Sequence, residues 1–348
     1  MARFQHYLDQ TVVDAAVERL EEIPNLFDDW VVMFSGGKDS LVTLHLVREI
    51  LGEPVKVVFR DHAWTPPVHR EFVNAYRLQP WVRMTWFLMT PVSRYILGER
   101  IRVDPWGNPP RIPPPAWGVN LGPNVLDREA MDRVTYQHLG LKGRVAYFTG
   151  LRACESLARL RSVLNNLNQP HIVKTPHKAA LIVKPIYDWL DNDVLKWLHQ
   201  NGIPWCPVYD QQHLSGTPLR MAPTLTSGRT AYLRNVARED PEYWERLLAA
   251  FPEVALQARY GREVVDAAVG FEGWQGCARF IRERMPETRK KAAWTAFWKT
   301  HRYAQHSPKS YTPDRLLVVL RRFSRSFDGG TMPLPPAIKD GEKGKTCT

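Results

Sequence analysis

Residues 30–52, WVVMFSGGKDSLVTLHLVREILG, join an apolar run to an amphipathic pattern through a short glycine turn. The run WVVMF (30–34) predicts a buried strand, and the apolar spacing over 39–51 predicts a helix. Gly36 and Gly37 lack a Cβ, so an anion can approach the main-chain N–H groups of the turn. The N-terminus of the helix adds unpaired N–H groups and the positive end of its dipole. This stretch therefore predicts a phosphate pocket.

The turn is a coherent oxyanion cradle, but it matches neither common nucleotide motif. Ser35 and Ser40 offer hydroxyl donors, and Lys38 offers a positive charge. A Walker A loop would need glycine where this chain has Val32, and Ser or Thr where it has Asp39. The turn does not follow the dinucleotide GxGxxG pattern either. The structural alternative is an ordinary glycine-rich turn, which the clear strand and helix on either side disfavour.

Further apolar runs alternate with helical patterns along much of the chain. The strand candidates are WVVMF (30–34), VKVVF (55–59), MTWFLM (84–89), VAYFT (145–149) and ALIVKP (180–185). Helical patterns occupy residues 39–51, 67–76 and 155–167. This alternation predicts an α/β fold, a mostly parallel twisted sheet covered by helices on both faces. Ligands bind such sheets beyond the carboxyl ends of the strands, where the glycine turn falls.

Changes in composition divide the chain into four expected regions. They are an N-terminal helix (1–28), a nucleotide-binding α/β domain (29–235), a basic helical extension (236–328) and a disordered tail (329–348). Within the α/β domain, residues 104–123 hold seven prolines, so we expect neither a helix nor a central strand there. This proline-rich insert is either a rigid connector or a lid over the site. The connector is favoured because long loops are only sometimes functional.

The cysteines and the apolar content bound the class of protein. The four cysteines, Cys154, Cys206, Cys277 and Cys347, are dispersed without a CxxC pair. This spacing argues against a zinc ribbon, a disulfide framework and a self-contained iron–sulfur cluster. The polar N-terminus does not resemble a signal peptide, and no apolar run reaches the length of about 20 residues that spans a bilayer. We therefore expect a cytoplasmic protein without membrane contact.

The net charge of +11 is concentrated near the C-terminus, where residues 271–325 contain 13 Lys and Arg against 4 Asp and Glu. Such a region favours a polyanionic partner such as nucleic acid, although a solvated helical face is the plain alternative. Trp294, Phe297, Trp298 and Tyr303 lie among these basic residues. Their rings could stack on bases, but their helical spacing favours a core stripe.

The segment after the fourth strand candidate carries groups suited to anion binding. Gly150 is expected to end a strand and permit a tight turn. Arg152 and Arg159 lie two helical turns apart on one predicted face, and Arg binds phosphate or sulfate oxygens in a bidentate manner. Glu155 can order Arg159 at the i, i+4 spacing. The alternative is a surface helix with internal salt bridges.

Residues 184–210 are expected to be mainly architecture. Asp191 is placed to cap a helix, and Gly202 is placed to end it. Tyr209 and Asp210 are candidate groups at the edge of the site.

Four ordered motifs resemble one enzyme family. SGGKDS after a buried strand looks like the PP-loop of the adenine nucleotide alpha-hydrolases. Three further stretches are similar to the phosphoadenosine phosphosulfate (PAPS) reductase family within that superfamily. They are VVFRDHAWTPPVHREFVNAY (57–76), YFTGLRACESLARLRSV (147–163) and KPIYDWLDNDVLKWLHQNGIPWCPVYD (184–210). The resemblance covers roughly residues 28–225.

The resemblance implies roles for named residues. The loop of Ser35, Gly36, Gly37, Lys38, Asp39 and Ser40 would hold the pyrophosphate of ATP. The region around Asp61 and Gly150 would hold the adenosine. Lys38 and Arg152, together with Mg²⁺, would neutralise charge during displacement at the α-phosphorus, which makes them the candidate catalytic residues. Arg152, Glu155 and Arg159 are the candidate set for a second substrate or anion.

The intact loop favours one branch of the family. Members with this loop cleave ATP between the α and β phosphates, and examples are ATP sulfurylase small subunits and the ATP pyrophosphatase of DNA phosphorothioation. We therefore predict adenylyl transfer or ATP pyrophosphatase chemistry, linked to sulfur metabolism or nucleic-acid modification, without an iron–sulfur cluster. One alternative is a sulfonucleotide reductase, although Cys347 in KGKTCT lacks the Glu-Cys-Gly motif of that branch. Another is a non-catalytic, nucleotide-sensing subunit with a protein partner.

Overall fold

The computed structural model of this chain describes residues 9–89, 92–96, 99–121, 128–164, 168–175, 177–221, 230–266, 271–306, 308 and 311–324. The chain divides into unit 1 (Met1–Val92, Val103–Thr226 and Asn235–Ala250) and unit 2 (Ser93–Arg102, Ser227–Arg234 and Phe251–Thr348). The expected tail at 329–348, which includes Cys347, lies outside the described residues.

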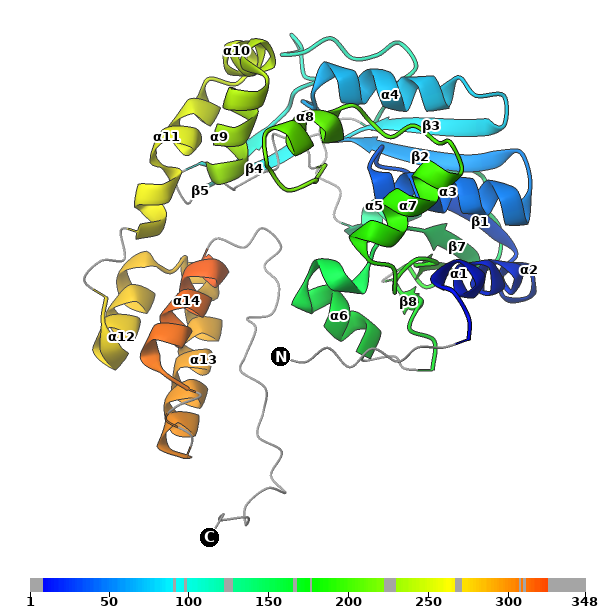
Figure 1. The fold of residues 1–348 in the computed structure, drawn as a ribbon. Coiled ribbons are helices and arrows are strands. Elements are labelled where there is room, and N and C mark those ends of the chain that lie inside the picture. Colours follow the sequence, from blue (N-terminus) through cyan, green and yellow to red (C-terminus); the bar gives the residue numbers. More distant parts are fainter. Residues whose placement is uncertain are drawn as a thin grey trace. The chain divides into compact units, whose positions relative to one another are not determined.

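Unit 1 is built around a seven-stranded sheet with the strand order β6-β3-β2-β1-β7-β9-β8 (Figure 1). The strands are β1 (Asp29–Met33), β2 (Val55–Asp61), β3 (Val82–Leu88), β6 (Val119–Asn120), β7 (Val145–Phe148), β8 (Ile172–Lys174) and β9 (Ala180–Val183). β8 runs antiparallel to β9, and the other neighbours pair in parallel. All five strand candidates are strands of this sheet, so the predicted mostly parallel α/β fold is confirmed.

Helices cover both faces of the sheet, as expected. α4 lies on the Phe59 face of β2, where the His69 and Phe59 rings are 6.2 Å apart. Met131 of α5 packs with Val58 on the opposite face, because successive strand residues point to opposite sides. The helices of unit 1 are α1 (Val12–Glu21), α2 (Ile23–Leu26), α3 (Lys38–Leu51), α4 (Pro67–Arg77), α5 (Arg128–His138), η1 (Ala153–Glu155), α6 (Leu157–Leu164), α7 (Asp191–Gln200), α8 (Val208–Leu214) and α10 (Pro241–Ala250), and α9 (Thr230–Glu239) runs from one unit into the other.

The strand and the helix on either side of the glycine turn are anchored in the core. Val31 and Val32 of β1 are fully buried, and so are Leu41 and Leu44 of α3. Burial of one such side chain contributes about 1.5–3 kcal/mol. Both ends of the turn are therefore held in place by packing.

The proline-rich insert packs against the edge of the sheet. Its end supplies β6, which pairs with β3 through Phe87↔Val119. A Cβ on Gly118 would lie 2.9 Å from the Leu88 side chain, so the insert approaches β3 closely. Trp117 meets Trp86 edge to face, with ring centroids 6.2 Å apart. The insert thus contributes an edge strand, in agreement with the prediction of neither a helix nor a central strand.

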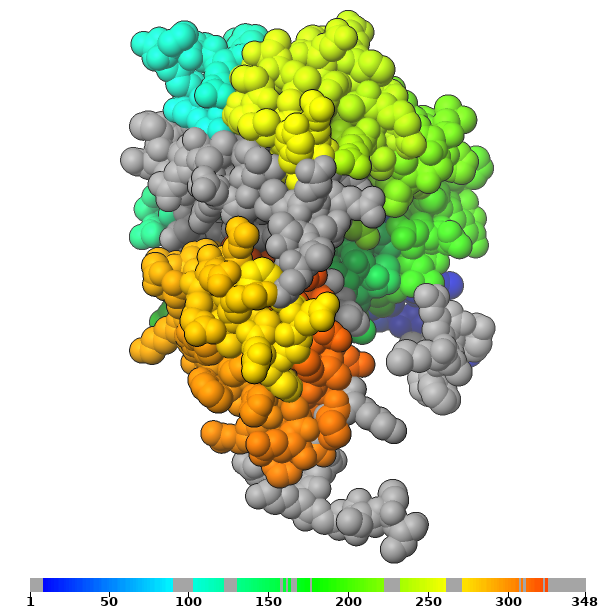
Figure 2. Space-filling view, turned by 90° about the vertical axis from the view of Figure 1, so that its left-hand side faces the viewer, coloured from blue at the N-terminus to red at the C-terminus, as the bar shows by residue number. Residues whose placement is uncertain are grey.

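Unit 2 combines a two-stranded sheet with helices. Its elements are β4 (Val92–Ile96), β5 (Glu99–Val103), α11 (Glu253–Asp266), α12 (Gly273–Arg284), α13 (Glu287–His306) and α14 (Pro313–Ser324). Phe297 of α13 is buried in a cluster made by α12, α13 and α14, and Trp294 packs against that cluster. Trp298 on the same helix is 60% exposed. Figure 2 shows the surface of this C-terminal part of the chain in orange. Tyr303 is half-buried. The expected core stripe of aromatic residues is thus only partly buried, and Trp298 is its exposed member.

Within the described part of the chain, the search for a membrane-crossing helix is negative, because no helix is both long and apolar enough.

Candidate phosphate-binding site

The glycine turn leads directly from β1 into α3. Gly36 has a φ of +73°, in the left-handed region that favours glycine. A Cβ at this position would also lie 2.4 Å from Nε2 of His69 and 2.7 Å from a methyl group of Val73. Gly36 is therefore required by its own backbone conformation and by the close approach of α4. Gly37 is the N-cap residue of α3, and a Cβ there would lie 3.1 Å from the hydroxyl of Tyr209.

The two loop serines hold the turn in shape. The Ser40 hydroxyl donates to the carbonyl oxygen of Gly37 at 2.9 Å. The hydroxyls of Ser35 and Ser40 lie 3.0 Å apart, and the main-chain N–H of Ser35 donates to the Ser40 hydroxyl at 3.2 Å. The main-chain N–H of Gly37 donates to the Ser35 hydroxyl at 3.3 Å. These contacts keep the turn compact and position both hydroxyls at the start of α3.

Two side chains from distant segments brace the loop. The main-chain N–H of Lys38 donates to the Tyr209 hydroxyl at 3.0 Å, and Nε2 of His69 lies 2.9 Å from the carbonyl oxygen of Ser35. Burial lowers the pKa of His69 to about 4, so the ring is neutral near pH 7. A carbonyl oxygen only accepts hydrogen bonds, and Nε2 therefore carries the proton. Tyr209 matches its predicted place at the edge of the site, whereas sequence reasoning missed His69.

Four charged side chains meet beside the loop. Nζ of Lys38 lies 3.1 Å from the Asp39 carboxylate and 3.0 Å from the Asp191 carboxylate. Nε of Arg152 lies 2.7 Å from Asp39, and its Nη2 lies 2.7 Å from Asp191. The Lys38 and Arg152 side chains are buried, with 3% and 1% exposure. The two predicted catalytic cations are thus brought together, and each is shared between the same two carboxylates.

The pairing changes the protonation properties of the cluster. Burial alone would lower the pKa of Arg152, but Asp39 and Asp191 outweigh it and raise that pKa above its usual value. Partial burial alone would raise the pKa of Asp191, but hydrogen bonding and attraction from Lys38 and Arg152 lower it. Both shifts favour the charged forms of Arg152 and Asp191. The formal charges of the two cations and the two carboxylates cancel.

The predicted helical face with two arginines is wrong. Arg152 is extended and precedes η1, and α6 begins only at Leu157, so Arg152 and Arg159 do not share one helix. The expected i, i+4 ion pair between Glu155 and Arg159 is confirmed. Glu155 also accepts a hydrogen bond from the main-chain N–H of Arg152 at 3.1 Å.

The predicted capping role of Asp191 is also wrong. The N-cap residue of α7 is Leu190, and its main-chain N–H donates to the Asp193 carboxylate at 2.7 Å. Asp191 is the first helical residue, and its carboxylate contacts Lys38 and Arg152 instead. The sequence contains two carboxylates here, Asp191 and Asp193, and either of them can cap the start of a helix. The sequence alone therefore could not show that Asp193 is the capping residue.

Gly150 allows the end of β7 to approach the start of α3. A Cβ on this residue would lie 2.4 Å from the main-chain carbon of Asp39 and 2.6 Å from the main-chain nitrogen of Ser40. Gly150 is not among the glycines with positive φ, so the expected tight turn is not the reason for glycine here. The reason is close backbone packing, and it sets the distance between Arg152 and the loop.

The positive groups near the cluster include two further arginines. The pKa of Arg159 is lowered, mainly by burial and also by the nearby charges of Arg152 and Arg220. Arg220 is exposed, and its main-chain N–H donates to the Gln212 side chain at 2.9 Å. Sequence reasoning missed Arg220, because it is about 60 residues from Arg159 in the chain and no sequence pattern shows that the two lie near each other.

Residues 29–87 and 129–234 match the family model of the phosphoadenosine phosphosulfate reductase domain. The chain carries a domain of this family. The two matched segments contain the glycine loop, Asp61, Arg152 and Asp191. The recognition made from the four sequence motifs is thereby confirmed.

Curated relatives of this PAPS reductase domain protein match over part of their length. A sulfate adenylyltransferase subunit 2 of Alkalilimnicola ehrlichii is 25% identical over 222 residues, which are 58% of this chain and 64% of the relative. The uncharacterized protein YbdN of Escherichia coli is 24% identical over 242 residues, 63% of this chain and 59% of the relative. The chain therefore spans about three fifths of the length of these relatives. A crystal structure of the PAPS reductase of Candida auris matches 57% of this chain and 86% of its own, with 16% identity and a TM-score of 0.35.

Asp61 of the PAPS reductase domain is fully buried at the end of β2. Its carboxylate accepts hydrogen bonds from Nε1 of Trp86 at 3.0 Å and from Arg70 at 3.1 Å. Burial raises the pKa of Asp61 to about 6, although Arg70 and Trp86 oppose that rise. The structure thus places Asp61 as an anchor between β3 and α4.

Three of the cysteines, Cys154, Cys206 and Cys277, lie among the described residues, and all three are free thiols. Burial raises the pKa of Cys206 and of Cys277 to about 11, so both are inert thiols near pH 7. Cys154 is exposed, and Nη1 of Arg152 donates to its sulfur at 3.2 Å. Among the residues that the structure describes, no cluster of His, Cys, Asp or Glu could hold a metal ion by itself.

Proposed function

We propose that this protein uses ATP and cleaves it between the α and β phosphates, by adenylyl transfer or as an ATP pyrophosphatase. The observation that carries the proposal is the arrangement of Lys38 and Arg152 beside the glycine loop at the carboxyl end of β1. The similarity to a sulfate adenylyltransferase subunit 2 supports a nucleotide-using member of the family. The intact SGGKDS sequence supports a ligand that still carries its pyrophosphate.

The loop and the two cations supply what displacement at phosphorus requires. The N-terminus of α3 offers N–H groups and a positive dipole end to the pyrophosphate. Lys38 and Arg152 would neutralise the charge that develops on the departing pyrophosphate. Such reactions depend on position and charge neutralisation more than on covalent groups of the protein. Lys38 and Arg152 are therefore the proposed catalytic residues.

The carboxylates of Asp39 and Asp191 fit a role in holding Mg²⁺. Mg²⁺ in nucleotide sites is usually held by one or two carboxylates together with phosphate oxygens. The charges of Lys38, Arg152, Asp39 and Asp191 cancel, so pyrophosphate meets a cluster without excess positive charge. Mg²⁺ would supply the missing positive charge when bound with ATP.

The remaining predicted residues receive proposed places around this centre. We expect the adenosine beyond the carboxyl ends of β2 and β7, where Asp61 and Gly150 lie. We propose that Arg159, which pairs with Glu155, contacts an anionic second substrate together with the nearby Arg220. The charged edge of the site thus suits an anionic acceptor of the adenylyl group.

A protein partner is part of the proposal. Two relatives are named subunit 2 of sulfate adenylyltransferase, which supports assembly with another subunit. If the chain alone binds ATP without turnover, the nucleotide-sensing interpretation gains support. Activity that appears only on addition of a copurifying subunit would instead support a catalytic complex.

The proposal is tested with ATP labelled at the α-phosphorus. Purified protein, Mg²⁺ and the labelled ATP are incubated with and without sulfate, nucleic acid and thiols, and the products are separated. We expect labelled AMP or an adenylylated acceptor, with release of pyrophosphate. Lys38→Ala and Arg152→Ala should each lower turnover by about 10²-fold or more, because a buried charge that stabilises the transition state is lost.

Matched surface variants control for the loss of charge. Lys56→Ala breaks an ion pair with Asp29 at 2.7 Å, and Arg48→Ala breaks one with Glu53 at 2.6 Å. Both should retain wild-type turnover. Full activity of Lys38→Ala and Arg152→Ala in an active preparation would overturn the site assignment.

A sulfonucleotide reductase is the second candidate, and the exposed Cys154 beside Arg152 favours it. A reductase needs a reactive thiolate, and Cys206 and Cys277 are excluded by burial. The test is release of sulfite from PAPS in the presence of a thiol reductant. Loss of sulfite release in Cys154→Ser or in Cys347→Ala would identify the nucleophile. Intact ATP together with sulfite formation would favour this candidate over adenylyl transfer.

A further inference from the structure

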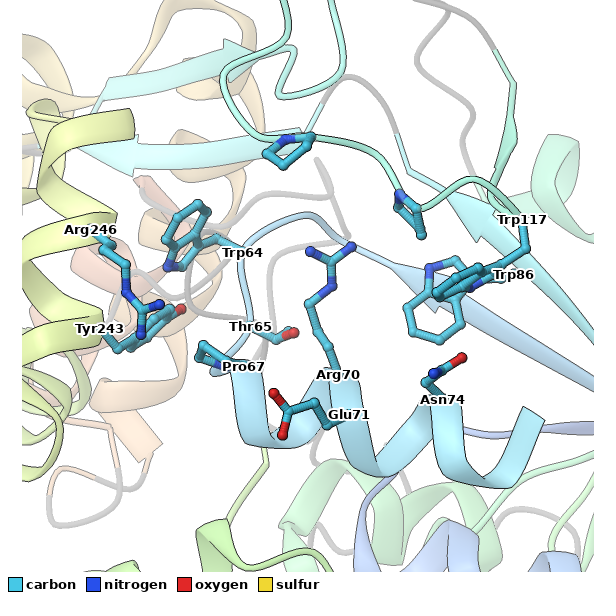
Figure 3. Close-up of a pocket in the computed structure, with 12 residues that line it drawn as sticks. Trp64, Thr65, Pro67, Arg70, Glu71, Asn74, Trp86, Trp117, Tyr243 and Arg246 are labelled. Carbon is cyan, nitrogen blue, oxygen red and sulfur yellow. The ribbon is translucent and has the colours of Figure 1, made fainter. Parts of the chain in front are cut away.

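A cavity lies beside α4 in unit 1. Its volume is about 350 Å³, within the usual range of small-molecule pockets. Arg70 and Asn74 of α4 line it, one helical turn apart on the same face (Figure 3). His69 and Val73, which pack against Gly36, lie about 100° around the helix from Arg70 and Asn74 and do not line the cavity. The cavity is therefore distinct from the proposed pyrophosphate site.

Aromatic rings form the two ends of this cavity. Trp64 and Tyr243 stack with ring centroids 5.7 Å apart and an interplanar angle of 16°. Trp86 and Trp117 meet edge to face at 6.2 Å. Figure 3 shows the two pairs on either side of Arg70. Such walls suit a planar ring, because aromatic surfaces stack on any flat π-system.

The charged groups of the cavity favour an anion. Arg70 stands in the middle, and Arg246 lies beside Tyr243 (Figure 3). Asp61 holds Arg70 through a 3.1 Å ion pair, so its guanidinium is already oriented. Arg246 is exposed, and Glu71 is the acidic residue of the lining. Two guanidinium groups around one small cavity provide bidentate donors for phosphate or carboxylate oxygens.

Thr65 gives an independent indication that the cavity suits a polar ligand. The residue is only 6% exposed and lines the cavity, and its hydroxyl has no hydrogen-bond partner among the described residues. Figure 3 shows this hydroxyl directed toward Arg70. A buried polar group without a hydrogen bond is destabilising, so a polar ligand atom that bonds this hydroxyl would be favoured.

The proline-rich insert completes the cavity. Pro113, Pro115 and Trp117 of the insert line the cavity together with residues of α4. Proline limits the conformations of the chain, which favours a preformed wall over one that must be ordered on binding. The insert is therefore more than a connector between strands.

We propose that this cavity binds a planar aromatic anion of the mononucleotide class, at a site separate from the glycine loop. The ring lies between the Trp64–Tyr243 and Trp86–Trp117 pairs, and the anionic group contacts Arg70 and Arg246. The Thr65 hydroxyl bonds a polar atom of the ligand. The cavity uses none of the loop residues, and it adjoins the proposed adenosine position through Asp61, which orients Arg70.

The test uses the fluorescent nucleotide 1,N6-ethenoadenosine 5′-monophosphate and the full chain. Binding is followed by fluorescence quenching and anisotropy, because stacking on tryptophan changes both. Trp117→Ala and Arg246→Glu should each raise the Kd about tenfold, and Thr65→Val should raise it severalfold. Lys38→Ala should leave this Kd unchanged. Trp117 is 43% exposed and Arg246 is on the surface, so both variants should fold, as near-UV circular dichroism will check.

Matched variants elsewhere control for nonspecific loss. Tyr260→Ala removes an aromatic ring that is 36% exposed in unit 2, and Arg83→Glu reverses an exposed arginine of β3. Both should bind the probe as wild type does. The proposal is overturned if Trp117→Ala and Arg246→Glu bind normally, or if binding disappears in Lys38→Ala. It is also overturned if neutral ethenoadenosine binds as tightly as its monophosphate.

Discussion

The ammonium group of Lys38 lies 3.0 Å from the carboxylate of Asp191, at the first residue of a distant helix. The same carboxylate lies 2.7 Å from Arg152. The Lys38 and Arg152 side chains are buried, whereas the Asp191 side chain is 67% exposed. Asp191 is thus the member of the cluster that is best placed to move when phosphate oxygens arrive. It acts as a built-in counter-ion for the two catalytic candidates.

Asp191→Asn should tighten the binding of Mg²⁺-free pyrophosphate. The substitution leaves Lys38 and Arg152 with one carboxylate instead of two, so the loop gains one net positive charge. We expect about a tenfold decrease in Kd, measured by calorimetry in EDTA. Asp193→Asn is the control, because that carboxylate caps Leu190 and is not part of the cluster. Weaker binding in Asp191→Asn would contradict the counter-ion role.

Gly150→Ala should disturb the loop through backbone contact alone. The added Cβ would lie 2.4 Å from main-chain atoms of Asp39, and main-chain atoms cannot rotate aside. We expect a loss of about 1–3 kcal/mol in the free energy of unfolding, measured with urea, and loss of pyrophosphate binding.

Gly216→Ala separates this effect from ordinary glycine strain. Gly216 has a φ of +65°, and a Cβ there would meet no atom within 4 Å. The left-handed conformation should cost about 1–2 kcal/mol, with normal pyrophosphate binding. Equal pyrophosphate binding by the two variants would show that Gly150 does not set the loop geometry.

Local patterns were sufficient to predict the sheet and the loop. The strand over 30–34 and the helix over 39–51 are encoded by apolar spacing, which depends only on neighbouring residues. Short elements with weak patterns escaped prediction. β8 has only three residues, and α5 carries a mostly polar sequence.

Tertiary contacts explain why the rest of the site could not be predicted. His69, Tyr209 and Asp191 reach the loop from α4, α8 and α7, and no spacing in the sequence records those approaches. The prediction that Arg152 and Arg159 share one helical face was wrong for a local reason. Ser156 is extended, with a φ of −164°, and separates η1 from α6. One extended residue is enough to break a helical phase, and the sequence RACES contains no proline or glycine to signal it.

The stability of the protein should fall as pH is lowered from about 6.5 to about 4. Burial lowers the pKa of His45, His62, His69 and His171 from 6.5 to about 4. Between these pH values the histidines of the unfolded chain are protonated while the buried histidines of the folded chain stay neutral. The unfolded state therefore binds more protons, and acid favours unfolding. Asp61 acts in the opposite direction, because burial raises its pKa from 3.8 to about 6 and the folded state takes up its proton first. The four histidines outweigh this single group.

Asp61→Asn tests this balance. The variant lacks the opposing group, so its free energy of unfolding should fall more steeply between pH 6.5 and pH 4 than that of the wild type. Urea titrations at several pH values measure both slopes. A wild-type stability that rises over this interval would contradict the assignment of neutral, buried histidines.

Nucleic-acid binding by the basic extension stays a prediction, and one face of α13 offers the groups to test it. Lys291 and Arg302 are exposed and lie at helical spacing with Trp298, which is 60% exposed. Arg289 and Lys290 are engaged within unit 2, since Arg289 donates to the carbonyl oxygen of Phe323 and Lys290 pairs with a glutamate. Lys291, Trp298 and Arg302 are therefore the groups to test, together with the neighbouring exposed Lys299.

The combined variant Lys291→Glu, Lys299→Glu and Arg302→Glu should weaken DNA binding at low salt. Each lost phosphate contact lowers the dependence of log K on log salt by about 0.9, so three contacts should lower the slope by about 2.7. Trp298→Ala should weaken single-stranded binding without changing that slope, because stacking releases no counterions.

The triple variant Arg83→Glu, Lys142→Glu and Lys178→Glu makes the same change in net charge on unit 1 and serves as the control. Fluorescence anisotropy measures all four proteins against labelled oligonucleotides, and wild-type protein without salt-sensitive binding would rule out a nucleic-acid role for α13.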